Sequence, residues 1–217
     1  PGGVGGRFLR KEQPSLEAQL CNLADEIAYN AHDIDDGVRS GLITLAQLAD
    51  IPLFDHYRRV AQAEHPHLVG AAMERRLLYE AIRRMLSAQV YDVIEATSDA
   101  LAVAAPRSVA DVRLAATLVG FSAPMRAQSS ELKRFLFKNL YRHPQVVETT
   151  GRAQRVVTEL FAAYVAEPRE MKPRFTRQAL EGEPSARARA VADFIAGMTD
   201  RFAGREHERL TGLRLLG

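Results

Sequence analysis

Apolar residues recur at helical spacing along almost the whole chain. Between residues 15 and 36 they stand three or four positions apart, at Leu16, Leu20, Leu23, Ile27, Ala31 and Ile34. This is the period of an α-helix that packs one face against a core. No run alternates apolar and polar residues with β-branched enrichment, and no Asn-Gly hairpin dipeptide occurs. The sequence therefore predicts an all-α fold, a compact multi-helix array.

Proline, glycine and capping residues divide the chain into segments. A first helix begins at Ser15, a plausible N-cap, and ends near Gly37 or Gly41. Further helices are predicted over 44–52, 53–64, 67–104, 108–118, 130–142, 144–166 and 185–202. Residues 121–129 are predicted to be a loop, residues 167–184 a mobile connection, and the tail 204–217 is weakly determined. We expect a flexible lead-in over 1–14 and a single helical domain over 15–217.

The bulk composition fits one domain that stays inside the cell. The chain has 217 residues, of which 47% are hydrophobic, and a net charge of +2. One cysteine excludes an intrachain disulfide and suits a reducing compartment. No apolar run reaches the length of a membrane span, and the first residues lack the apolar core of a signal peptide. We expect a cytoplasmic protein without a membrane partner.

The densest polar cluster lies on the first predicted helix. Asp25, Tyr29 and Asp33 are four residues apart, so they rise along one side of that helix. Two carboxylates and a phenol in line could bind an extended polar ligand, and a metal ion could offset the repulsion between the acids. Spacing alone leaves a second reading open, in which this is a solvated acidic face and His32 a bystander.

Three segments together resemble a known family. SLEAQLCNLADEIAYNAHDIDDGVRSG (15–41) looks like a helix of the bacterial deoxyguanosine triphosphate triphosphohydrolase-like proteins, which carry an HD-type catalytic domain. ELKRFLFKNLYRHPQV (131–146) and VADFIAGMTDRFA (191–203) resemble further blocks of that family in the same order. The resemblance thus spans residues 15 to 203. It implies that the chain is the C-terminal part of an HD-type phosphohydrolase.

The resemblance assigns roles to the first helix. In that family a His, a His-Asp pair and a later Asp hold a metal centre, and Asp25 matches the later Asp. Tyr29 and Asp33 match residues that pack on the deoxyribose and bind its 3′-hydroxyl. The implied reaction is hydrolysis of a dNTP to a deoxynucleoside and triphosphate, with a divalent metal such as Mg²⁺ or Mn²⁺. The family also implies a homo-oligomer.

The sequence departs from the family in its metal ligands. The family's His and His-Asp pair stand far upstream of this helix, whereas 14 residues precede Ser15 here. His32-Asp33 is a His-Asp dipeptide inside the wrong block. One carboxylate does not hold a catalytic metal tightly, so we expect this chain alone to be inactive. The alternative is a non-catalytic regulatory or nucleic-acid-binding helical module, although no motif supports single-stranded nucleic acid as a partner.

Other residues leave two readings open. The pairs Arg75-Arg76 and Arg83-Arg84 could bind phosphate or form a solvated face with Glu74 and Glu80. A row of cations with an aromatic near its end could reach a triphosphate or belong to a plain amphipathic helix: Lys133, Arg134, Lys138, Arg142 and Tyr141. Cys21 is expected to be an inert core thiol. Asp193, Asp200 and Arg201 are expected to form an ion-pair set.

Overall fold

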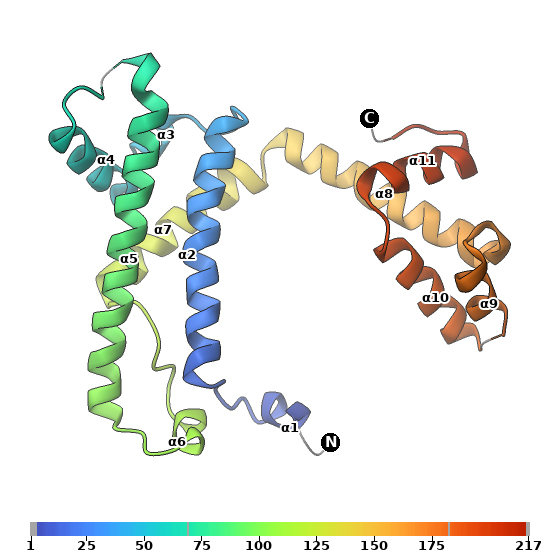
Figure 1. The fold of residues 1–217 in the computed structure, drawn as a ribbon, viewed down its shortest axis with the longest axis horizontal. Helices are drawn as coiled ribbons and strands as arrows, with labels where there is room; N and C mark the ends of the chain where they lie inside the picture. Colours follow the sequence, from blue (N-terminus) through green and yellow to red (C-terminus); the bar gives the residue numbers. More distant parts are fainter. Residues whose placement is uncertain (1–3, 69, 182, 216–217) are drawn as a thin grey trace. The chain divides into compact units, whose positions relative to one another are not determined.

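The chain folds into helices joined by short connections (Figure 1). The computed structural model describes residues 4–68, 70–181 and 183–215. No strand occurs in these three ranges, which confirms the all-α prediction. The contacts divide the chain into two compact units, 1–143 and 144–217, and each unit is described by itself.

The first unit is built around two long helices. Helices α2 (Leu16–Arg39) and α5 (Glu74–Ala104) lie side by side, and α7 (Ala123–Leu136) packs against α2 (Figure 1). Helix α4 (Pro52–Glu64) packs on both α5 and α7. The other elements are α1 (Val4–Leu9), α3 (Leu45–Leu48), a 3₁₀ turn (Ala71–Met73), α6 (Val109–Leu114) and a π-helical turn (Phe137–Tyr141).

Helix α2 follows the predicted pattern in its second half and departs from it in its first. Ser15 caps the helix by accepting a hydrogen bond from the backbone N–H of Ala18 at 3.4 Å. Ile27, Ala31 and Ile34 are buried. Leu20 and Cys21 are exposed, so the prediction of a buried Cys21 thiol is wrong. The first two turns of α2 are therefore less buried than the apolar pattern of the sequence predicts.

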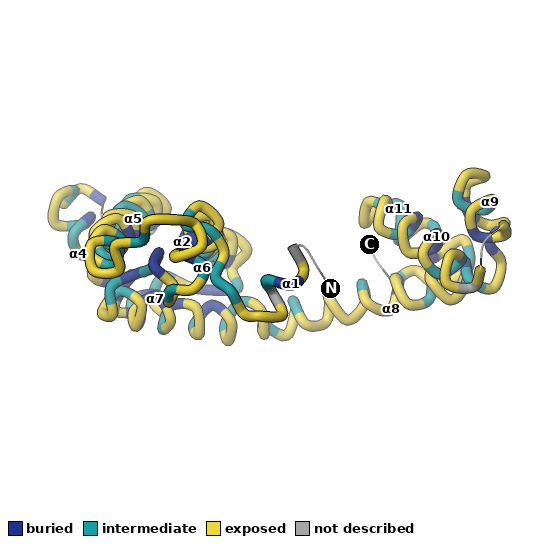
Figure 2. Tube along the Cα trace, turned by 90° about the horizontal axis from the view of Figure 1, so that it is seen from below, coloured by how far each residue is buried: buried dark blue, intermediate teal, exposed yellow. Residues whose placement is uncertain are grey.

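Two of the three apolar clusters in the described part of the first unit hold α2, α5 and α7 together, and the third lies around Ala61 and Leu77. The larger one joins Ile34 of α2, Met85 of α5 and Leu132 of α7 to the buried residues of α3 and α4. The smaller one joins Ile27 of α2 and Val93 of α5 to Val119 and Phe121, just before α7. Figure 2 shows buried and exposed residues alternating along α7, as amphipathic packing requires. The two clusters fix the faces that α2, α5 and α7 present to one another.

The start of α7 corrects the predicted loop over 121–129. Ser122 caps the helix by accepting from the N–H of Met125, and Pro124 sits in the first turn, where a missing N–H costs nothing. Asp92 of α5 fixes this cap, since its carboxylate accepts the Ser122 hydroxyl at 2.6 Å and the Ser122 N–H at 2.9 Å. A proline at this position therefore begins a helix rather than breaking one.

The second unit holds the helices α8 (Pro144–Ala166), α9 (Pro173–Glu181), α10 (Pro184–Ala196) and α11 (Asp200–Thr211), with a 3₁₀ turn at Pro168–Glu170. Its core contains Leu160, Tyr164, Val191 and Phe194. The predicted connection over 167–184 contains α9, because Pro173 starts a helix. The single helix predicted over 185–202 is wrong, since it ends at Gly197 and Thr199 caps α11 through the N–H of Phe202.

The single domain over 15–217 and the flexible lead-in over 1–14 stay predictions. Within the lead-in, Val4–Leu9 forms a helix, and the N–H of Gln13 donates to the carbonyl of Arg113. None of the described helices combines the length and the apolar character needed to cross a membrane.

The Asp92–Ser122 cap predicts a specific loss of stability. The Asp92→Ala variant leaves the half-buried N–H and hydroxyl of Ser122 without their acceptor, which costs about 2 kcal/mol of unfolding free energy. Urea denaturation followed by circular dichroism measures this change. Asp99→Ala, at an exposed position on the same helix, is the matched control and should leave the midpoint nearly unchanged. Equal midpoints for the two variants would show that the cap contributes nothing.

Candidate functional site

A cleft of about 550 Å³ runs between α2 and α7 in the first unit. One wall carries Asp25, Tyr29 and Asp33 on successive turns of α2. The structure therefore brings the three predicted residues to the same cleft. The remaining lining residues come from the same face of α2, from α7 and from the π-helical turn: Asn22, Glu26, Asn30, Lys133, Arg134, Leu136, Phe137 and Tyr141.

Two contacts cross this cleft. The phenol of Tyr141 donates a hydrogen bond to Oδ2 of Asp33, and the Lys133 ammonium lies 3.0 Å from Oε2 of Glu26. The first contact raises the pKa of Tyr141 to about 12, chiefly through the hydrogen bond to Asp33 and secondly through burial. Both contacts join α2 to residues more than a hundred positions later in the sequence. They hold the two walls of the cleft together.

The cleft combines open aromatic surface with free charge. Tyr29 is 59% exposed and Phe137 is 55% exposed, so their rings are available to a ligand. The side chains of Asp25 and Arg134 have no hydrogen-bond or ion-pair partner in the described part of the chain, and both line the cleft. A ligand that carries an apolar ring, a hydroxyl and an anionic group would find a partner for each of these parts.

The residues of this cleft do not make a metal centre by themselves. Among the residues that the structure describes, no three His, Cys, Asp or Glu side chains gather closely enough to hold a metal ion. Asp25 offers one carboxylate, the Glu26 carboxylate is paired with Lys133, and His32 is exposed and does not line the cleft. Any metal bound here needs ligands from outside this set of residues.

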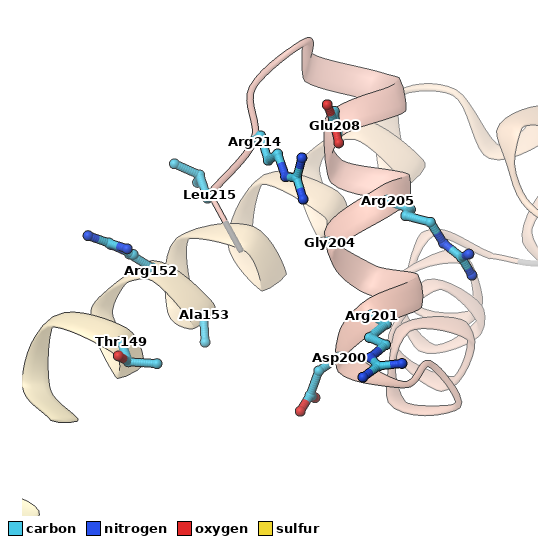
Figure 3. Close-up of a pocket in the computed structure, with 10 residues that line it drawn as sticks. All are labelled: Thr149, Arg152, Ala153, Asp200, Arg201, Gly204, Arg205, Glu208, Arg214 and Leu215. Carbon is cyan, nitrogen blue, oxygen red and sulfur yellow. The ribbon is translucent and has the colours of Figure 1, made fainter. Parts of the chain in front are cut away.

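A second and larger hollow, of about 830 Å³, lies in the second unit along α8, α11 and the segment after α11 (Figure 3). Four arginines and two carboxylates line it: Arg152, Arg201, Arg205, Arg214, Asp200 and Glu208. Figure 3 shows that Arg152 and Arg205 point in opposite directions. Because its cations do not converge, this hollow is a weaker candidate for binding a single ligand than the cleft on α2.

The other predicted charges are mostly paired. On α5, Arg83 pairs with Glu80, and Arg84 pairs with Glu64 of α4. The exposed Arg83 supports the solvated-face reading, whereas Arg84 is mostly buried and ties α5 to α4. Asp193 pairs with Arg189 rather than with Arg201, so the predicted ion-pair set does not form as expected.

The sequence predicted the residues of one wall of the cleft but not the contacts that this wall makes with the other. From the sequence, Lys133 belongs to a row of cations and Tyr141 is the aromatic residue near the end of that row. No signal in the sequence linked Tyr141 to Asp33 or Lys133 to Glu26, because residue spacing along one helix does not show which second helix packs against it.

Comparison with known proteins shows which domain part of the chain resembles. Residues 119–209 match the model of the phosphohydrolase-associated domain. This segment includes α7, with the second wall of the cleft, and extends through the second unit to α11. This part of the chain is thus similar to a domain described as phosphohydrolase-associated.

Curated relatives are similar to this chain over nearly its whole length. The chain is 48% identical over 215 residues to the deoxyguanosinetriphosphate triphosphohydrolase-like protein of Ralstonia nicotianae. The aligned residues cover 99% of this chain and 54% of that protein. It is 51% identical over 210 residues to the protein of the same description from Bordetella pertussis, covering 96% of this chain and 52% of the relative. The chain is homologous to deoxyguanosinetriphosphate triphosphohydrolase-like proteins and spans about half the length of the curated relatives it matches.

The Asp33–Tyr141 contact predicts a pH response. Because the folded pKa of Tyr141 is raised, the contact stabilises the fold below about pH 10 and is lost as the pH rises towards 12. In the Asp33→Asn variant the pKa of Tyr141 should fall towards the ordinary value of about 10. NMR of ¹³Cζ-labelled tyrosine measures this pKa, with Tyr141→Phe to assign the signal. Asp36→Asn, at an exposed position on the same helix, should leave the Tyr141 pKa in place, and an unchanged pKa in Asp33→Asn would rule out the contact.

Proposed function

We propose that the complete protein hydrolyses a dNTP to a deoxynucleoside and triphosphate, and that this chain is its C-terminal part. In this proposal the chain supplies one metal-ligand carboxylate and the sugar-binding wall of the active site. The observation that carries it is the cleft itself, in which Asp25, Tyr29 and Asp33 face a second wall from α7. The similarity to triphosphohydrolase-like relatives supports a nucleotide as the ligand.

Asp33 and Tyr29 suit the sugar. One carboxylate oxygen of Asp33 accepts the Tyr141 hydroxyl, and its other oxygen can accept a second hydroxyl, which we assign to the deoxyribose. The exposed ring of Tyr29 lies one turn earlier on the same wall and provides a flat apolar surface for the sugar. Bulk at this position would also disfavour a ribose, whose 2′-hydroxyl needs more room.

The charged groups suit the triphosphate end. Asp25 lies one further turn along α2, and we assign it as one ligand of a divalent metal, Mg²⁺ or Mn²⁺. The remaining ligands would come from the part of the protein outside this chain. Arg134 has a free guanidinium on the opposite wall and can pair with phosphate oxygens. A cytoplasmic homo-oligomer is part of the same proposal, by analogy with the family.

Removal of the proposed metal ligand tests the first assignment. In the complete protein, Asp25→Ala should lower metal-dependent dNTP turnover about 100-fold or more, because the ion loses a direct ligand. Asp36→Ala, at an exposed position on the same helix and outside the cleft, is the control. Release of triphosphate measured at saturating metal compares the two. Full activity in Asp25→Ala would show that Asp25 is not a ligand.

Truncation of the proposed sugar contact tests the second assignment. Tyr29→Ala in the complete protein should raise the KM for dNTP about tenfold with a smaller change in kcat, since it removes contact area in both the ground state and the transition state. Turnover of the matching ribonucleotide should rise relative to that of the dNTP. An unchanged KM together with unchanged sugar selectivity would place the sugar elsewhere.

The same assay applied to the isolated chain tests the division of roles. The 217-residue chain alone should not release triphosphate from any dNTP, because its described residues do not assemble a metal centre. Measurable hydrolysis by the purified chain would contradict this.

A further inference from the structure

Three polar side chains are buried in the first unit without a hydrogen-bond partner. Asn30 on α2 is 5% exposed, Gln89 on α5 is fully buried, and Ser129 on α7 is 2% exposed. In the described structure the Asn30 Nδ2, both amide ends of Gln89 and the Ser129 hydroxyl have no partner. The Nε of Arg84 also lacks one, but the two terminal nitrogens of that guanidinium are paired with Glu64, so Arg84 is set apart from the other three. Buried polar groups are nearly always hydrogen-bonded, because leaving one unpaired costs as much as a lost hydrogen bond. Three such groups in one unit call for an explanation.

On α2 and α5 these residues stand between the two apolar clusters. Asn30 follows Ile27 of the smaller cluster by three positions and precedes Ile34 of the larger one by four. On α5, Gln89 lies four positions from Met85 of the larger cluster and four from Val93 of the smaller one. Residues three or four apart share a helix face, so both side chains lie at the level where one cluster gives way to the other.

Helix α7 brings the third residue to the same level. Ser129 precedes Leu132 of the larger cluster by three positions and follows Met125 by four. Met125 packs against both clusters, so it lies close to their boundary. Asn30, Gln89 and Ser129 thus form a polar layer, one residue from each of three helices, between two apolar layers.

We propose that this polar layer is an internal site for ordered water. All three residues lie at the level where one cluster gives way to the other, and no hydrogen bond satisfies their unpaired atoms in the described structure. A bridging water can satisfy buried polar groups that do not bond to one another directly. Together the groups offer amide and hydroxyl donors and a carbonyl acceptor, which matches the two to four partners of a buried water molecule.

The position of Asn30 connects this site to the cleft. Asn30 is buried and also lines the cleft beside Tyr29 and Asp33. Water bound behind it ties α2 to α5 and α7 at the level of those two residues and so reinforces the rotation of α2 that its buried apolar residues set. Asn30, Gln89 and Ser129 are positioning residues for the wall of the cleft. This inference goes beyond the proposed function, because it requires neither a nucleotide nor a metal.

The sign of one stability change tests the proposal. Gln89→Met keeps the length and volume of the side chain but removes both polar ends. If water links the layer, the variant leaves Asn30 and Ser129 without part of their hydrogen-bond network, and Tm should fall by about 2–6 °C. If Gln89 is unpaired in a dry core, removing its polar ends relieves a penalty, and Tm should rise or stay the same. The second result would overturn the proposal.

A matched pair of serines supplies the control. Ser129→Ala should lower Tm by about 2–4 °C, whereas Ser130→Ala, at the neighbouring exposed position of the same helix, should change it by about 1 °C or less. Equal shifts for the two would argue against a role specific to the layer.

A high-resolution crystal structure of the unsubstituted protein gives a readout that does not depend on the stability of any variant. It should show at least one water oxygen within hydrogen-bonding distance of two or more of Asn30, Gln89 and Ser129. Direct bonds among the three side chains, or no water between them, would overturn the proposal even if every variant folds. Neither experiment uses dNTP hydrolysis, so each can fail independently of the proposed function.

Discussion

The packing of one face of α2 against α5 and α7 is the interaction on which the first unit depends. Ile27, Ala31 and Ile34 bury this face, and at about 100° per residue they fix the rotation of the whole helix. Asp25, Tyr29 and Asp33 then point well away from the buried stripe, into the cleft that α7 closes. Asn30 stands at the border between the two, which is why it is buried and still lines the cleft. Hydrophobic burial therefore sets where the polar row faces.

Local signals predicted the elements whose ends are determined by neighbouring residues. Thr44 caps α3 where the helix was predicted to start, and Pro144 occupies the first turn of α8 as predicted. Pro52, predicted to end the helix before it, instead begins α4. The start of α7 was missed because its cap also depends on Asp92, 30 residues earlier on another helix. The exposure of Cys21 was missed because it depends on which part of α2 is covered, and no local pattern carries that information.

The candidate site was also only partly predictable from the sequence. The row of Asp25, Tyr29 and Asp33 could be predicted, since one helix carries all three residues at regular spacing. Tyr141 could not be paired with Asp33 in advance, because that contact joins residues 108 positions apart and requires the packing of α7 on α2. The polar layer was equally hidden, since Asn30, Gln89 and Ser129 are unremarkable in isolation and become informative only when three helices bring them to one level.

The most direct measurement is a crystal structure of the complete protein with Mn²⁺ and a slowly hydrolysed dNTP analogue. We predict that the deoxyribose lies in the cleft between Tyr29 and the Asp33–Tyr141 pair, and that a carboxylate oxygen of Asp25 is bonded to the metal. A nucleotide bound away from the α2–α7 cleft, or a metal held without Asp25, would contradict the assignment of this chain as one wall of a dNTP triphosphohydrolase site.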